Sequence, residues 1–173
     1  EAMQKKHLLA YFNQTKLQQF VLANNLAGQV RDSPGDYLQV VFSNVKGSKT
    51  DAVIDNSFQL AVSEKDAAHQ LKINRLHNGG DLNYGFYNRT NPTYVRVYVP
   101  AGAVLAGITG YSQVDYPPLL GHADYNFKTD PDLQALEAGT SHPLPGVDVY
   151  TESGKTVFGF WLVLKPKESK SVT

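Results

Sequence analysis

The densest set of side chains that could bind a metal lies between residues 122 and 132. Ca²⁺ takes about six to eight oxygen ligands from flexible loops. The spacing departs from an EF-hand, because Lys128 stands at a ligand position and no Gly follows it. The same segment suits Asx-turns and a helix capped by Asp130. Two interpretations of the segment therefore remain: a Ca²⁺ site that stabilises an adhesin-type domain, and a capped helix without a metal. The candidate ligands are Asp124, Asn126, Asp130 and Asp132, with His122 nearby.

Ser141, His142 and Asp148 supply the side-chain types of a hydrolase triad. The sequence has no Gly-x-Ser-x-Gly segment, which would expose a nucleophile on a sharp turn. Its five histidines include no pair separated by one helical turn, the spacing of a zinc site on a helix. We therefore expect no catalytic residue and no cofactor apart from the Ca²⁺ candidate, and we predict that the chain is not an enzyme.

Tyr94, Arg96 and Tyr98 point to one side of the extended stretch YVRVYV, and three valines point to the other. Aromatic rings offer rigid contact area to a sugar or a peptide, so these three residues are the candidate ligand or partner surface. Alternating Tyr and Arg are also ordinary cross-strand partners, and the pattern favours this second interpretation. Further members of the candidate surface are Tyr84, Phe86, Tyr87 and Arg89.

Asn44, Lys49 and Asp51 flank the junction between two hydrophobic patterns. Polar residues at that position are expected to tie the loop to the end of the helix. A spontaneous Lys to Asn crosslink would need a buried Lys that faces an Asn beside an acid, and the sequence does not place the three together. A surface ion pair worth at most about 1 kcal/mol is the expected role of Lys49.

The N-terminal third of the chain has the pattern of a strand, a helix and a second strand. His7–Phe12 is an apolar run of strand length, and Asn13 after it is a favoured helix cap. Apolar residues at helical spacing predict a helix over residues 14–25, and Tyr37–Val45 predicts the second strand. We interpret residues 1–54 as a βαβ remnant of an upstream domain.

Residues 55–173 have the alternating pattern of short antiparallel strands. Phe58, Leu60 and Val62 alternate with polar residues and predict the first half of a hairpin. The strand Tyr94–Val99 is followed by Pro100 and Gly102, so Ala103–Ala106 is expected to return as the next strand. The sequence therefore predicts an immunoglobulin-like antiparallel β-sandwich, and for the whole chain an α+β, mainly β fold.

The last third of the chain begins with an irregular insertion, residues 111–146, that is rich in Pro. Asp130 and Pro131 predict one short helix there, over Pro131–Glu137. Strands are expected at Val147–Tyr150 and Thr156–Leu164, and both faces of the second strand are apolar. Such a strand lies in the middle of a sheet that is covered on both sides.

Composition excludes some classes of partner. The sequence has 16 basic and 16 acidic residues, which argues against nucleic acid, and it has no Cys. No run approaches the roughly 20 apolar residues of a membrane helix. Because the chain starts at Glu1 without an initiator Met and stops just after a strand begins at Ser169, we expect a fragment of a longer protein.

Three segments resemble the C-terminal part of the bacterial domain-of-unknown-function family 4012: YLQVVFSNVKGSKTD, YVRVYVPAGAVL and ESGKTVFGFWLVLKPKESKSVT. The resemblance extends over most of the chain from about His7 onward. In place of a Pro-Gly-Glu-Ser pattern this sequence has Pro166-Lys167-Glu168-Ser169, and Lys167 argues for a type I turn without positive φ.

The resemblance implies a location, because members of that family have an N-terminal transmembrane helix and a long extracytoplasmic part without established activity. We accordingly expect a noncatalytic structural or interaction module of a bacterial envelope protein. Its partner would be an envelope component or another protein, and only an N-terminal anchor would contact the membrane. The alternatives are an accessory domain of a cell-wall or polymer-processing enzyme whose active site lies upstream, and the Ca²⁺-stapled adhesin domain.

Overall fold

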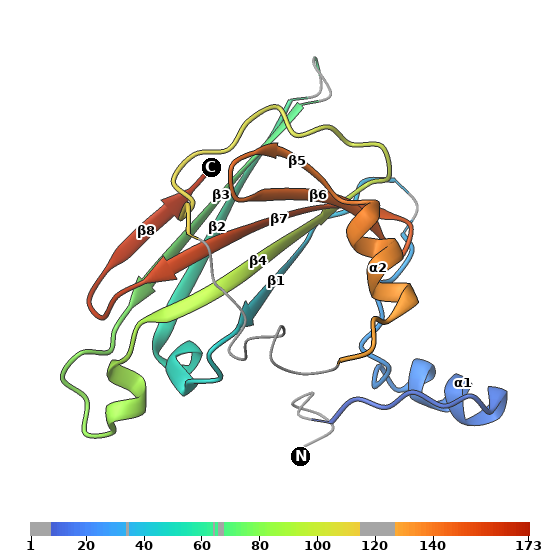
Figure 1. Ribbon diagram of the computed structural model, residues 1–173, viewed down its shortest axis with the longest axis horizontal. Helices are drawn as coiled ribbons and strands as arrows, with labels where there is room; N and C mark the ends of the chain where they lie inside the picture. Colours follow the sequence, from blue (N-terminus) through green and yellow to red (C-terminus); the bar gives the residue numbers. More distant parts are fainter. Residues whose placement is uncertain (1–7, 34, 64, 66–67, 115–126) are drawn as a thin grey trace. The chain divides into compact units, whose positions relative to one another are not determined.

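The computed structural model of the protein describes residues 8–33, 35–63, 65, 68–114 and 127–173 (Figure 1). The chain divides into two compact units, Glu1–Gly35 and Asp36–Thr173. The second unit includes Gln39–Asn44, which pairs with Asn91–Val99. Gln39–Asn44 therefore belongs to the same unit as residues 91–99, whereas the sequence pattern had grouped residues 1–54 together.

Among its described residues, the first unit contains one helix, α1 (Thr15–Ala23), within the predicted range. Its N-cap position is Gln14, not Asn13, and no side chain caps it. The predicted strand at His7–Phe12 is wrong for its described part, because residues 8–12 form neither strand nor helix. The Ala10 N–H donates to the Leu26 carbonyl at 3.0 Å, so this segment has a loop as its neighbour instead of a strand. A βαβ segment is therefore absent from the described residues.

Five antiparallel strands form the larger sheet, in the order β1-β4-β7-β6-β5. The strand β7 lies in the middle, as its two apolar faces predicted. The edge strand β5 was not predicted, because Pro143 lies within it. Pro cannot donate to a neighbouring strand, and it is tolerated at a sheet edge. The bounds are β1 (Gln39–Asn44), β4 (Asn91–Val99), β5 (Ser141–Leu144), β6 (Val147–Glu152) and β7 (Lys155–Leu164).

Three antiparallel strands form the smaller sheet: β2 (Ile54–Ser63), β3 (Ala68–His77) and β8 (Ser169–Val172), in the order β2-β3-β8. The predicted hairpin and the strand at Ser169 are confirmed. The predicted return strand at Ala103–Ala106 is wrong, because β1 and β7 already occupy both sides of β4. The segment continues instead to Thr109, which exchanges backbone hydrogen bonds with Thr173 at 2.9 and 3.1 Å.

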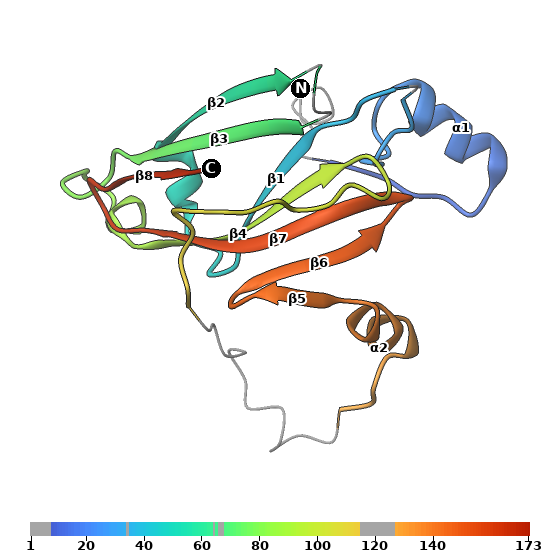
Figure 2. The same ribbon diagram turned by 90° about the horizontal axis from the view of Figure 1, so that it is seen from above.

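The two sheets face one another in separate layers (Figure 2). Ile73 and Val172 of the smaller sheet pack in one core with apolar residues of the larger sheet. The α+β, mainly β prediction is thus confirmed. The strand order differs from that of an immunoglobulin domain, which groups its first, second, fifth and fourth strands in one sheet. Here the first strand lies beside the fourth. The buried core residues from the larger sheet are Val95, Val97, Val147, Phe160, Leu162 and Leu164.

A buried polar network lies next to η1 (Lys49–Val53) and joins the two sheets. The Arg75 side chain is only 1% exposed. Its Nε donates to Asn56 Oδ1 at 2.7 Å, and its Nη2 lies 3.3 Å from Asp51 Oδ1. The guanidinium also lies 4.3 Å from the centre of the Phe42 ring, and burial lowers the Arg75 pKa while Asp51 raises it. These contacts give the buried charge the partners that it needs.

Two turns set the connections around β7. Ser153 and Gly154 both have positive φ, 51° and 69°, as a type I′ hairpin turn requires between β6 and β7. The predicted type I turn before β8 is wrong, because Lys167 has a φ of 65°. The Lys167 N–H donates to the His77 carbonyl at 2.8 Å, and its ammonium lies 2.8 Å from Asp81. Tertiary contacts therefore hold Lys167 in a conformation that its type disfavours.

Candidate functional site

The outer face of the larger sheet, which is turned away from β2-β3-β8, carries a row of polar and aromatic side chains. Tyr94 of β4 pairs with Trp161 of β7, while Asp148 of β6 pairs with Gly159. The Tyr94 ring crosses β7 at Gly159, where a Cβ atom would lie only 2.1 Å from the Tyr94 hydroxyl oxygen. That hydroxyl donates to Asp148 Oδ2. The glycine therefore permits a link between strands that are not neighbours.

His142 of the edge strand β5 completes the chain of contacts. Its Nδ1 lies 2.8 Å from Asp148 Oδ1. Because a carboxylate accepts only, Nδ1 carries a proton, and the lone pair of a neutral ring lies on Nε2. The side chain of His142 is 67% exposed and that of Asp148 is 30% exposed. Ligands can therefore reach the imidazole, while the carboxylate lies deeper.

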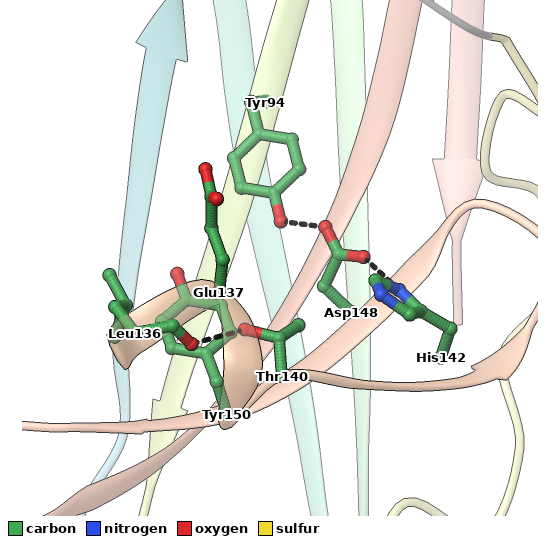
Figure 3. A pocket seen from close by; sticks show the side chains of 7 residues that line it. All are labelled: Tyr94, Leu136, Glu137, Thr140, His142, Asp148 and Tyr150. Atoms are coloured by element: carbon green, nitrogen blue, oxygen red, sulfur yellow. Dashed lines mark hydrogen bonds and ion pairs between the residues drawn. The ribbon is translucent and has the colours of Figure 1, made fainter. Parts of the chain in front are cut away.

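These residues line a pocket of about 290 Å³ between the sheet face and α2 (Pro131–Ala138) (Figure 3). Asp130 starts α2, and its carboxylate accepts from the N–H groups of Asp132 and Leu133. The Thr140 hydroxyl donates to the Leu136 carbonyl at 2.9 Å and is thereby occupied. The lining residues are Tyr94, Leu136, Glu137, Thr140, His142, Asp148 and Tyr150.

The pocket combines two acidic side chains with neutral phenols. Burial raises the pKa of Tyr94 well above its ordinary value, and the hydrogen bond to Asp148 raises it further. Tyr94 is thus a proton donor at neutral pH and neither a base nor a nucleophile. Burial also raises the pKa of Tyr150. With Glu137 and Asp148 beside these rings, the pocket suits hydroxyl or ammonium groups.

The candidate surface residues Tyr94, Arg96 and Tyr98 lie in one row on β4, but their side chains differ in exposure and in the groups that they contact. Tyr98 is 2% exposed, and its hydroxyl donates to Glu152 Oε2 at 3.0 Å. Arg96 Nη1 lies 3.5 Å from the same carboxylate oxygen. Of the three, only Tyr94 lines the pocket. Tyr98 is an internal cross-strand partner and is not available to a ligand.

The other aromatic candidates form a separate group in η2 (Gly85–Asn88) and the residue before it. The ring centre of Phe86 lies 5.4 Å from that of Tyr84 and 4.4 Å from that of Tyr87. Lys49 Nζ lies 5.8 Å from the centre of the Phe86 ring. The three rings thus pack against one another, and none of these residues lines the pocket.

Of the triad candidates, the structure brings together His142 and Asp148 but not Ser141. The two neighbours Ser141 and His142 alternate along β5. The Ser141 hydroxyl donates to the Val149 carbonyl at 3.2 Å. The arrangement is therefore an Asp-His pair without the serine nucleophile that acyl transfer would require.

Sequence reasoning missed the link between Tyr94 and Asp148, and the contributions of Glu137 and Tyr150. One signal was present, because an isolated Gly within an apolar strand indicates that another group approaches closely. Gly159 is such a residue. The identity of the approaching group depends on strand order, and the sequence pattern did not provide it.

The Ca²⁺ candidates are only partly within the described residues, since Asp124, Asn126 and His122 lie outside them. Asp130 Oδ1 accepts from two backbone N–H groups, at 2.9 and 3.2 Å, as a helix cap. In the described part of the chain, no group of three or more His, Asp or Glu side chains could hold a metal ion.

Asn44 and Asp51 of the junction lie in contact, since Asn44 Nδ2 donates to Asp51 Oδ2 at 2.8 Å. The cation that pairs with Asp51 is Arg75. Asn91 Nδ2 donates to Thr50 Oγ1 at 2.8 Å and extends the network. These side chains connect the sheets, so their role is structural.

Comparisons with known proteins identified no relative. No family model matches the chain, and neither the curated proteins nor the solved structures include a significant match. Among the described residues, no helix combines the length and the apolar character needed to span a membrane.

Proposed function

We propose that the chain is a noncatalytic, extracytoplasmic interaction module of a bacterial envelope protein that is membrane-anchored at full length. The pocket beside Tyr94, Asp148 and His142 is its binding site. Its ligand is an envelope polymer that bears hydroxyl or ammonium groups, such as a glycan or a peptidoglycan fragment.

The observation that carries the proposal is the hydrogen-bonded chain from Tyr94 through Asp148 to His142. Groups held by one another keep their positions without a ligand, and such preorganisation reduces the entropy lost on binding. Asp148 and Glu137 accept hydrogen bonds, and the Tyr94 and Tyr150 rings provide flat apolar walls. The envelope location rests on the resemblance of three sequence segments to family 4012.

Binding is favoured over bond cleavage by the state of the hydroxyl groups that line the pocket. Thr140 donates to a backbone carbonyl. Tyr94 donates to Asp148, and its raised pKa keeps it neutral. A nucleophile needs a base that removes its proton, and Asp148 already serves Tyr94 and His142 as an acceptor.

A binding screen with soluble glycans and peptidoglycan fragments, read by calorimetry, tests the site. We expect a ligand whose affinity falls about tenfold or more in Asp148→Asn, since each lost charge-assisted hydrogen bond costs about 1.5–3 kcal/mol. Asp132→Asn, on the helix α2 but outside the pocket lining, is the matched control and keeps the affinity. Equal binding by wild type and Asp148→Asn rules out this pocket.

The location is tested separately on the full-length protein in its own cells. We expect it in the membrane fraction, with this module cleaved by protease added outside the cytoplasmic membrane. Protection of the module in intact spheroplasts contradicts an extracytoplasmic location.

A further inference from the structure

A second cavity, of about 1170 Å³, lies between the two sheets. The β2-β3 hairpin and the strands β4 and β7 fan apart from the lower left of Figure 1. Near η1 the sheets are close, with the ring centres of Phe42 and Phe58 6.1 Å apart. Toward the hairpin end the space widens, and Leu60 and Val62 are 49% and 56% exposed. Both lie on the same face of β2 as Phe58, whose cross-strand partner Ile73 belongs to the core.

Apolar side chains line this cavity on three sides. Leu60 and Leu71 come from the smaller sheet, and Val97 and Phe158 come from the larger sheet. The segment 103–109 forms the third side, where Thr109 is fixed to Thr173 by two backbone hydrogen bonds. Ligand sites typically have volumes of about 300–1,000 Å³, so the space is large enough for an elongated molecule.

Polar groups lie at the wide end of the cavity. His69 Nε2 lies 3.3 Å from Asp36 Oδ2, and these side chains are 38% and 58% exposed. The pair connects β3 with the segment before β1. An apolar interior with a polar rim is the arrangement that fits an amphiphile.

We propose that this cavity binds the acyl chain of a single-chain amphiphile whose polar head lies at His69 and Asp36. An acyl chain has no hydrogen-bonding groups, so it loses no hydrogen bonds when it is buried between apolar walls. A peptide strand would bring backbone N–H and C=O groups into the same walls, and burying them without partners is costly. The Asp36–His69 and Phe42–Phe58 contacts also bridge the side between β1 and β2, where a strand would enter.

Displacement of cis-parinaric acid from the wild-type chain tests the proposal. We expect saturable binding of one probe per chain, with competition by palmitate and by palmitoyl lysophosphatidylcholine. The stronger competitor identifies the source of the chain as a free fatty acid or a lipid. Leu60→Gln and, separately, Val62→Gln should weaken probe binding at least tenfold. Both residues are half-exposed, so each variant is expected to fold.

Leu76→Gln is the matched control, because Leu76 is 40% exposed on the opposite face of β3 and does not line the cavity. It should keep the wild-type affinity. Spin-labelled stearate should broaden the methyl signals of Leu60, Val97 and Leu105 and leave those of Leu136 unchanged. Absence of saturable binding overturns the proposal, as does unchanged affinity in both cavity variants. A dimer in sedimentation that Leu60→Gln dissociates, without probe binding, assigns the cavity to a second copy instead.

Discussion

The Tyr94 phenol occupies the space in which any side chain at Gly159 would lie, 2.1 Å from its Cβ position to the hydroxyl oxygen. The contact puts the hydroxyl against Asp148, two strands away from β4. The order of the strands, the absence of a side chain at Gly159 and the half-buried Tyr94 phenol together create the candidate site. Gly159 thus determines the geometry of the pocket although it does not line it.

Gly159→Ala should therefore displace Tyr94 and break its hydrogen bond to Asp148. Inserting a methyl group into a packed region costs about 1–3 kcal/mol of unfolding free energy. Urea unfolding measures this loss, and the ligand found for the pocket should also bind more weakly. Gly85→Ala is the control, because a Cβ there meets no atom within 4 Å. Equal stability of wild type and Gly159→Ala contradicts the tight contact.

Arg75→Met should weaken the joint between the two sheets. It removes the buried cation, and Asn56 Oδ1 and Asp51 lose the hydrogen bonds that Arg75 donates to them. Loss of one partner of a fully buried pair costs about 3–5 kcal/mol, and because Asp51 is 45% exposed we expect about 2–3 kcal/mol. Chemical denaturation gives the value, with the exposed Arg89→Met as the control. A loss as small as that of the control shows that the network does not stabilise the fold.

High pH should destabilise the protein through three tyrosines that are buried or half-buried. The pKa values of Tyr94, Tyr98 and Tyr150 are raised, first by burial, above the ordinary value of 10.0. Between pH 10 and their folded pKa values, the unfolded chain loses these protons and the folded chain keeps them, so stability falls as pH rises. Below about pH 9 the contribution is constant.

Urea midpoints between about pH 8 and pH 12 test this dependence. Tyr98→Phe should make the decline shallower, because it removes one of the groups whose ionisation favours the unfolded chain. Tyr84→Phe, an exposed ring of the η2 group, is the matched control. An identical decline in wild type and Tyr98→Phe argues against a raised Tyr98 pKa.

Asp130→Ala distinguishes the helix cap from the Ca²⁺ site. As a cap, Asp130 contributes about 1 kcal/mol, and the loss on substitution is the same with added Ca²⁺ or with chelator. As a Ca²⁺ ligand, it would stabilise the wild-type chain only when Ca²⁺ is present. We expect the melting temperature of the variant to fall equally in both conditions. A difference between the conditions supports the adhesin-type alternative.

The sequence by itself determined most of the elements, because their signals are local. Alternation predicted the hairpin of β2 and β3, and the two apolar faces of Thr156–Leu164 predicted a central strand. Asp130 and Pro131 predicted where α2 begins. Side chains of one element that face the core are apolar. The spacing of apolar residues, every second residue in a strand and every third or fourth in a helix, therefore indicates the type of element.

Only the tertiary structure decided which strands are neighbours. Residues 8–12 form no strand, and Ala103–Ala106 could not pair with β4 because both sides were occupied. Long-range contacts hold Lys167 at positive φ against its type. Asp148 lies 54 residues from Tyr94 in the sequence, and only their places on β6 and β4, across Gly159, bring the two together. Local spacing cannot encode that proximity, because it results from the order in which strands pair.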